Sequence, residues 1–430
     1  MLARIQKDIA WIDKVGGITD AMIRNISLVC NKQVSCQCNT RAIRMMIKDG
    51  ELYLTSVQPG FRLGPQEFAG FLLELYETTK LYRLPDVEFA YNGDDDANSP
   101  VFNWADGKEG EQSVFHGGPF PLLTWSKGPK SFGILTPYSG AFRCVDDSFD
   151  SILMRLDEIQ RSSPWEEKKS VAFGRWNEFC AVYVEQEPPL PDGSYFPCPR
   201  RHWPKLTDQH KDIMDVRVLH TQVDGKAVAS VPLMHQNRWK YLVSTDGWAI
   251  SSKFDKYLLL GSTIIKSWSS RFGFYYDALK PGEHYLLAMT QNSTDLIQAI
   301  RWAQANDQQA ATIAANAQRF AVRHLHRRAR LCYYRILMEE LAKRMKYVPD
   351  CSKRTLCIPA GQFLEFMTTY PRTYKSCMGT QEVLMRHGVN YTLQQGKYPR
   401  DRLQAMLADE RLFPIDTDIP LMDDMPYFIC

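Results

Sequence analysis

The stretch GPQEFAGFLLELYETTKLYRLPDVEFAYNGDDD, residues 64–96, decides the fold class. Apolar side chains recur on one side of the segment from Gly64 to Thr79, which predicts a helix that begins after the Gly-Pro pair. The short apolar run Pro85–Tyr91 predicts a buried strand. Upstream, Arg41–Val57 predicts two strands joined by the turn Lys48-Asp49-Gly50-Glu51. Strands and a helix in this order predict an α/β domain.

Three aspartates, Asp94, Asp95 and Asp96, follow the predicted strand. Ligands of α/β domains bind outside the carboxyl ends of strands, so a functional carboxylate is expected at this position. In a sugar transfer with inversion, a carboxylate can take the proton of the acceptor hydroxyl as general base. The Asp-x-Asp spacing of Asp94 and Asp96 also suits a divalent metal held against a diphosphate. A solvated acidic turn is the commonest meaning of such a trio, and all three interpretations stay open.

The remainder of the chain predicts a second α/β half. A helix is expected from Asp147 to Gln160, and Ser162-Ser163-Pro164 ends it, so we place a domain change there. Further strands are expected at residues 170–173, 216–219, 239–243 and 263–266, and helices at 5–29, 252–260 and across 294–347. The resulting domains are 1–163, 164–347 and a loop-rich extension, 348–430.

Composition excludes several classes of protein. With 430 residues, 44% of them hydrophobic and 23% charged, the chain is globular rather than disordered, and it is long enough for two cores. A net charge of +3 is too small for a general nucleic-acid surface, and we expect no nucleic-acid partner. No apolar run approaches the roughly 20 residues that span a bilayer. The charged start, Met1–Gly17, shows no signal-peptide segment.

The cysteines and glycosylation motifs bear on the compartment. Eleven cysteines include the close pairs Cys36/Cys38 and Cys351/Cys357, but they lack zinc-site spacing, so buried thiols or a few disulfides are expected. Sequons at Asn25, Asn292 and Asn390 favour a secretory compartment, although such motifs are common by chance.

Two stretches of the second half could bind phosphate. Phe173-Gly174-Arg175 ends a predicted strand, where glycine allows close backbone approach and arginine can grip a phosphate with two donors. The loop Asp246–Lys253 precedes a predicted helix, and its amides with Ser251 and Lys253 suit a diphosphate. Each alone is more often an ordinary loop. A basic helix face, also more often solvated than functional, is predicted from Arg319, Arg323, Arg327 and Arg330.

Several of these stretches stand in the order found in one family. The chain resembles the Rumi-like protein O-glucosyltransferases and the fungal capsule-associated xylosyltransferases over residues 40–345, most densely over 238–307. The matching segments are Leu84-Pro-Asp-Val-Glu-Phe, Asn92–Asp96, Pro100-Val-Phe-Asn-Trp104, Arg238-Trp-Lys-Tyr-Leu, Asp246–Lys253, Leu260-Gly261-Ser262, Leu279–Tyr285, Asp295-Leu296 and Ala305-Asn-Asp307.

The resemblance implies a fold and a reaction. It implies a GT-B-like pair of Rossmann-like domains facing a cleft, with C-terminal helices. It also implies metal-independent transfer, with inversion, of glucose or xylose from a UDP-sugar to a hydroxyl on a protein or glycan in the lumen of the ER or Golgi. By the same resemblance Asp95 is the base, and UDP is bound by Gly174, Arg175, Ser251 and Lys253.

The chain departs from the family pattern in three ways. The arginine that usually precedes Gly174 is missing, Trp176 stands where a small residue is usual, and Lys253 replaces an arginine. These departures leave the donor sugar open. They also leave two other interpretations open: a catalytically inactive binding protein with this fold, and a metal-dependent transferase that uses Asp94 and Asp96.

Overall fold

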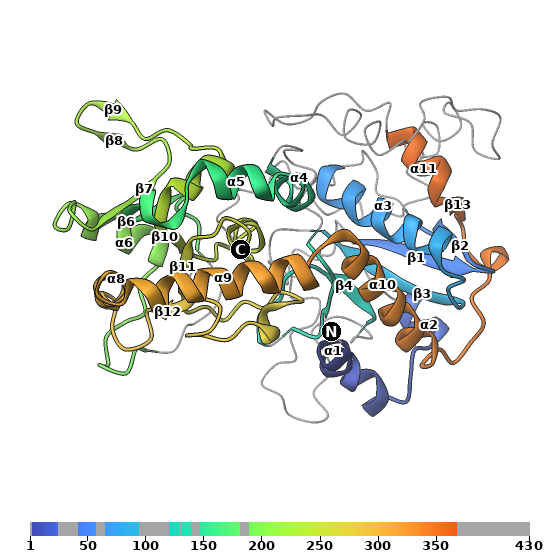
Figure 1. Cartoon of the computed structure of the whole chain (residues 1–430). Coiled ribbons are helices and arrows are strands. Elements are labelled where there is room, and N and C mark those ends of the chain that lie inside the picture. Colours follow the sequence, from blue (N-terminus) through green and yellow to red (C-terminus); the bar gives the residue numbers. More distant parts are fainter. Residues whose placement is uncertain are drawn as a thin grey trace. The chain divides into compact units, whose positions relative to one another are not determined.

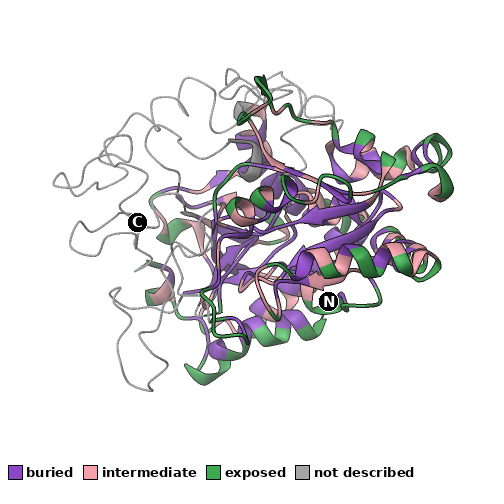
Figure 2. Ribbon diagram, turned by 90° about the vertical axis from the view of Figure 1, so that its left-hand side faces the viewer, coloured by how far each residue is buried: buried purple, intermediate pink, exposed green. Residues whose placement is uncertain are grey.

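The computed structural model describes residues 2–24, 42–56, 65–93, 120–129, 131–138, 147–180 and 189–367. The chain divides into two compact units (Figure 1). The first is formed by Met1–Val145 together with Arg330–Cys430, and the second by Asp146–Ala329. In Figure 2 the strands of both sheets are largely buried, whereas the outer faces of several helices are exposed.

The first unit is built on a mixed six-stranded sheet in the order β13-β2-β1-β3-β4-β5. The pairs along β13, β2, β1 and β3 are antiparallel, whereas β3, β4 and β5 run parallel. The strands are β1 (Ala42–Lys48), β2 (Glu51–Leu54), β3 (Val87–Asn92), β4 (Leu122–Thr124), β5 (Ile134–Leu135) and β13 (Ile358–Pro359).

The predicted hairpin of β1 and β2 is confirmed. Lys48 pairs with Glu51, so Asp49 and Gly50 form a two-residue turn. Both have positive φ, 53° and 81°, the combination that such a turn requires and that aspartate and glycine tolerate.

The helices of the first unit are α1 (Leu2–Lys14), α2 (Asp20–Arg24), α3 (Pro65–Leu81), α11 (Ala360–Met367) and most of α10 (Arg327–Ala342). The α3 prediction is confirmed to within two residues. The prediction of one helix over residues 5–29 is wrong: α1 ends at Lys14, because Gly16 and Gly17 have φ of 84° and 114° and turn the chain.

The second unit is built on a parallel five-stranded sheet in the order β12-β11-β10-β6-β7. Numbered along the chain, this order is 2-1-3-4-5, that of a doubly wound fold, with its switch point between β6 and β10. The expected α/β class is thereby confirmed. The strands are β6 (Lys169–Trp176), β7 (Met214–Val218), β10 (Trp239–Ser244), β11 (Thr263–Ser267) and β12 (Leu286–Ala288), with a separate hairpin of β8 (Gln222–Val223) and β9 (Lys226–Ala227).

Helices α4 (Phe149–Met154), α5 (Leu156–Ser162), α6 (Pro199–Thr207), α7 (Phe254–Tyr257), α8 (Asp295–Ala305) and α9 (Asp307–His324) belong to the second unit. Short 3-10 segments are η5 (Trp165–Glu167), η7 (Leu233–Arg238), η8 (Tyr276–Ala278) and, in the first unit, η9 (Cys351–Lys353). One core cluster joins Trp203 of α6, Tyr241 and Val243 of β10, and Leu296 and Ile300 of α8.

The bounds of the two compact units differ from those of the predicted domains, 1–163, 164–347 and 348–430. Helix α5 lies with the second unit, where the Asn237 side-chain amide donates to Ile159 O at 2.9 Å. Helix α10 lies largely with the first, where the Tyr333 hydroxyl donates to Leu135 O at 2.8 Å. In the expected extension, β13 completes the first sheet.

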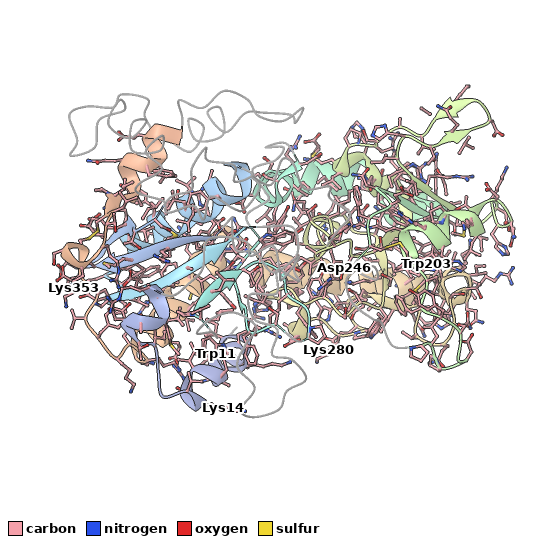
Figure 3. The ribbon with its side chains drawn as sticks, turned by 180° about the vertical axis from the view of Figure 1, so that it is seen from behind. Trp11, Lys14, Trp203, Asp246, Lys280 and Lys353 are labelled. Atoms are coloured by element: carbon pink, nitrogen blue, oxygen red, sulfur yellow. A yellow bond between two sulfur atoms is a disulfide. The ribbon has the colours of Figure 1, made fainter. Side chains whose placement is uncertain are left out.

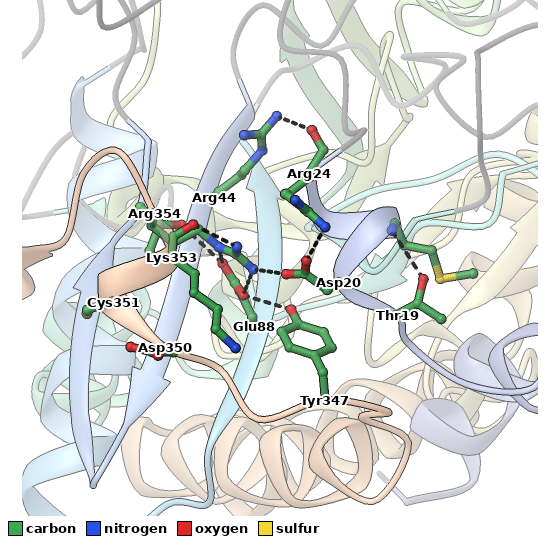
Figure 4. A network of polar contacts seen from close by, with 12 residues as sticks. Thr19, Asp20, Arg24, Arg44, Glu88, Tyr347, Asp350, Cys351, Lys353 and Arg354 are labelled. Atoms are coloured by element: carbon green, nitrogen blue, oxygen red, sulfur yellow. Dashed lines mark hydrogen bonds and ion pairs between the residues drawn. The ribbon is translucent and has the colours of Figure 1, made fainter.

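A buried ion-pair network ties the segment after α10 to the first sheet (Figure 4). The Glu88 side chain on β3 is fully buried and accepts hydrogen bonds from Arg354 at 2.7 and 2.6 Å and from the Tyr347 hydroxyl at 2.7 Å. Arg354 also donates to Asp20 at 2.7 Å. This carboxylate therefore holds β3, α2 and the chain before β13 together.

We expect Glu88→Ala to lower the free energy of unfolding by about 3–5 kcal/mol, because Arg354 would remain as a buried charge without its main partner. The control is Glu51→Ala, which breaks an ion pair with Lys80 in which both side chains are about half exposed. That change should cost under about 1 kcal/mol. Urea unfolding measures both, and equal losses would contradict the role given to Glu88.

Candidate functional site

The switch point of the second sheet gathers cationic side chains. β6 and β10 are neighbours, with Phe173 opposite Leu242, and the next strands along the chain lie on opposite sides of this pair: β7 beside β6, and β11 beside β10. Ligands of doubly wound sheets bind at such a point. Arg175 is the next-to-last residue of β6. Arg200 lies in the first turn of α6, and Lys253 lies in the loop after β10.

Lys253 is the centre of this cationic cluster. Its Nζ donates to Arg175 O at 2.5 Å. Burial, together with the positive charges of Arg200 and Arg175, lowers the pKa of the Lys253 amine to about 8, and Asp147 opposes that effect. The ammonium is therefore under-compensated by the protein, and an anion would stabilise it.

The charges of both arginines also act on Tyr257. Burial raises the pKa of its hydroxyl, and the charges of Arg175 and Arg200 oppose that rise. The hydroxyl donates to Gln236 Oε1 at 2.7 Å. The positive charges of the cluster thus extend from the loop to the buried side of α7.

Arg200 was not predicted, and it links the ends of both central strands. Its Nε donates to Thr245 Oγ1 at 3.1 Å, its Nη2 to Thr245 O at 3.0 Å, and its Nη1 to Asn177 O at 3.4 Å. A Cβ at Gly247 would lie 2.7 Å from Nη1, so a larger residue at this position would displace the guanidinium. The paired arginines at the start of α6 were the available signal, but a Pro-rich loop surrounds them.

Asp246 anchors the loop that carries Lys253 (Figure 3). Its buried carboxylate accepts hydrogen bonds from the Ser251 amide at 2.8 Å and from the Tyr276 hydroxyl at 3.0 Å, and it pairs with Lys266 at 2.8 Å. Burial would raise the pKa of Asp246, but the Lys266 charge and these hydrogen bonds hold it below its usual value. Asp246 therefore stays ionised and fixes the loop.

Arg175 directs its guanidinium away from this loop. It donates to Asp215 Oδ2 at 2.7 Å and to Asp215 O at 2.8 Å, and it lies over the Phe173 ring at 4.4 Å. Arg175 therefore acts on Lys253 through its backbone carbonyl, which accepts the Lys253 hydrogen bond, and through its positive charge. A direct grip on phosphate by Arg175 stays a prediction.

Gly174 makes room for a neighbouring ring. A Cβ there would lie 2.5 Å from Trp176 Cζ3, so this glycine lets the indole fold back over the strand. The indole Nε1 donates to Arg200 O at 2.9 Å. Trp176, the departure from the family pattern, therefore positions Arg200.

The predicted helix 252–260 is wrong in length, because α7 covers only Phe254–Tyr257. Such a short helix has little dipole, so attraction for an anion depends on the side-chain charges. Ser251 is buried, and its hydroxyl accepts a hydrogen bond from the Lys253 amide at 3.4 Å.

Two other predicted features have different outcomes. Asp94, Asp95 and Asp96 lie outside the described residues. The continuous basic helix face is wrong: α9 ends at His324, α10 begins at Arg327, and Arg330 is buried in an ion pair with Glu74 at 2.6 Å.

Within the described ranges, no three His, Cys, Asp or Glu side chains are placed to hold a metal ion. Over the same residues, no helix combines the length and apolar character needed to cross a membrane.

Comparison with known proteins gives the family. Residues 4–376 match glycosyl transferase family 90. The chain belongs to this family. The family resemblance is thereby confirmed, and the expected class of enzyme, a glycosyltransferase, agrees with it.

Curated relatives of this family-90 chain carry related names. Protein O-glucosyltransferase 1 of Rattus norvegicus is 27% identical over 64% of the chain and 66% of its own length. Protein O-glucosyltransferase 3 of Homo sapiens is 32% identical over 64% of the chain and 50% of its own length. The chain thus spans between half and just under two thirds of the length of these relatives. A solved structure of Anabaena Alr3699/HepE in complex with UDP-glucose is 12% identical, with 44% of the chain and 53% of that chain covered and a TM-score of 0.26, too low to support an argument.

We expect the Lys253 amine to titrate near pH 8 and its pKa to rise in Arg200→Ala, because a repelling charge is removed. Bound pyrophosphate should raise it as well. Pyrophosphate affinity is then full below pH 8 and falls as the pH rises through that value, by up to about tenfold per unit. NMR of isotopically methylated lysines and calorimetry from pH 6.5 to 9.5 test this. An unchanged pKa in Arg200→Ala would refute the coupling.

Proposed function

We propose that this chain is an inverting glycosyltransferase that moves glucose or xylose from a UDP-sugar to a hydroxyl of a protein or glycan acceptor. The observation that carries the proposal is the gathering of Arg175, Arg200 and Lys253 at the switch point of a doubly wound sheet. The names of the family-90 relatives, protein O-glucosyltransferases, support a glucose-like sugar and a protein acceptor.

The cluster suits the leaving group of such a reaction. When the bond from the sugar to the diphosphate breaks, negative charge grows on the phosphate oxygens. A cation with a pKa of about 8 gains most from this charge, because the phosphate restores the protonation that burial disfavours. Since Asp246 and Ser251 hold the loop before the donor arrives, the cluster needs little rearrangement.

The base and the absence of a metal requirement rest on the family resemblance. We assign the general base to Asp95 because, by the resemblance, it falls on the position of the family's base, after β3 in the sequence. We propose that UDP leaves with the help of side-chain cations rather than a metal ion.

The cysteines support the proposed compartment. Cys180–Cys198 and Cys351–Cys357 are disulfides. Disulfides persist in oxidising compartments and are rare in the cytosol. Together with the sequons at Asn25, Asn292 and Asn390, they support the lumen of the secretory pathway.

The donor site makes a prediction about charge. Arg200→Ala and Lys253→Ala should each weaken UDP binding about ten- to a hundredfold, since a charge-assisted hydrogen bond is worth about 1.5–3 kcal/mol. Arg175→Ala should weaken it as well, through the loss of charge and of β6 geometry. Arg301→Ala, an exposed cation on α8, is the control and should bind as the parent does. Calorimetry with UDP decides: parent-like affinity in both Arg200→Ala and Lys253→Ala would place the donor elsewhere.

The base makes a prediction about rate. Asp95→Asn should lower sugar transfer by about two to four orders of magnitude while UDP affinity stays the same, because asparagine accepts no proton at neutral pH. Asp94→Asn and Asp96→Asn are the matched controls, assayed with and without a chelator.

Other outcomes would favour the alternatives. Loss of donor binding in Asp94→Asn and Asp96→Asn, with activity abolished by the chelator, would indicate a metal-dependent transferase. UDP binding without transfer or hydrolysis by the parent would indicate an inactive binding protein.

A further inference from the structure

We propose that the Cys180–Cys198 disulfide positions Arg200 for the nucleoside diphosphate, and so acts as part of the donor site rather than only as a fold stabiliser. The proposal rests on the proposed function, because its ligand is the diphosphate of the donor.

The disulfide lies between the two elements that carry the arginines. Cys180 follows β6 by four residues, and Cys198 immediately precedes α6, with the two Cα atoms 5.8 Å apart. Both cysteines are buried. The covalent bond therefore fixes the start of α6, and with it Arg200, against the end of the strand that contains Arg175.

Hydrogen bonds and an exposed ion pair also join these two stretches. Trp176 Nε1 donates to Arg200 O at 2.9 Å, and Arg200 Nη1 donates to Asn177 O at a longer 3.4 Å. The ion pair of Arg201 and Glu178, at 3.4 Å, joins two side chains that are about half exposed. Hydrogen bonds that can exchange with water, and exposed ion pairs, add little net stability. The disulfide is thus the strongest of these links.

The middle of α6 is fixed separately. The Trp203 side chain is fully buried in the core cluster of the second unit, and its Nε1 donates to Ser293 O at 3.2 Å. Without the disulfide, α6 would still be packed through Trp203, but its first turn would lose the covalent link to the segment after β6 and would be held there by hydrogen bonds. Arg200 lies in that first turn, between the two fixed points.

A displacement of this first turn would act on ligand binding more than on folding. Arg200 reaches Thr245 and passes within contact of Gly247 only if its backbone stays where the disulfide holds it. Disulfides act in part by restricting the chain before it binds or folds. Without the disulfide, diphosphate binding would also have to order Arg200, and the entropy cost of that ordering would weaken the affinity.

The test measures UDP and pyrophosphate affinity by calorimetry in the full chain. C180S/C198S should bind UDP about tenfold more weakly than the parent, within the range of coupling between residues in contact. C351S/C357S removes a disulfide that lies in the first unit and is the matched control, with affinity expected within about twofold of the parent. Thermal unfolding shows that each variant is folded. If C180S/C198S does not fold, C180A/C198V, which fills the same volume with apolar atoms, replaces it.

A mutant cycle with Arg200 separates positioning from general stability. In the Arg200→Ala background, loss of the Cys180–Cys198 disulfide should change UDP affinity by less than about twofold, because the side chain it positions is gone. An equal tenfold loss in both backgrounds, or parent-like affinity in C180S/C198S, would overturn the inference while leaving the donor site intact. A parent that binds neither UDP nor pyrophosphate would overturn both the donor site and this inference.

Discussion

The buried carboxylate of Asp246 is the interaction on which the second unit's site depends. Asp246 follows the carboxyl end of β10. Its carboxylate pairs with Lys266 of the neighbouring strand β11 and accepts hydrogen bonds from the Ser251 amide and the Tyr276 hydroxyl. Because a buried charge must be paired and hydrogen-bonded, these donors fix the carboxylate, and the carboxylate in turn fixes the loop after β10. Gly247 and Lys253 are then held at opposite ends of that loop, one beside Arg200 and the other beside Arg175 O.

This arrangement separates two kinds of charge. Lys266 is neutralised by Asp246, and Arg175 is paired with Asp215, so these cations are satisfied without a ligand. Lys253 donates only to neutral carbonyl oxygen in its described hydrogen bond, and burial depresses its pKa. In the proposed donor site, the positive charge that lacks a carboxylate partner in the described contacts is therefore that of one amine, while the paired charges around it maintain the geometry. Concentrating the electrostatic cost in one group limits the loss of stability.

How much the sequence predicts depends on how local the cause is. The hairpin at Asp49-Gly50 and the helix α3 were predictable because the turn chemistry and the helical period lie within a few residues of each other. The prediction of one helix over residues 5–29 was wrong because Gly16 and Gly17 turn the chain, although the apolar spacing before them is helical. In the site, Ser251 and Lys253 could be proposed because one short loop carries both. Arg200 could not, since its partner Thr245 is 45 residues away and only the packing of α6 brings them together.

The departures from the family pattern become coherent once these long-range contacts are considered. Phe173, which stands where the family usually has an arginine, stacks on Trp239 at 3.8 Å and supports the Arg175 guanidinium on its own ring. Trp176, in place of a small residue, occupies the space above Gly174 and holds the backbone of Arg200. At the end of β6, aromatic packing thus stands where the resemblance implies an arginine. A cation at this end of the sheet is instead carried by α6, as Arg200. A cation carried by a helix must be held against the sheet, and that requirement gives the disulfide at the start of α6 its physical purpose.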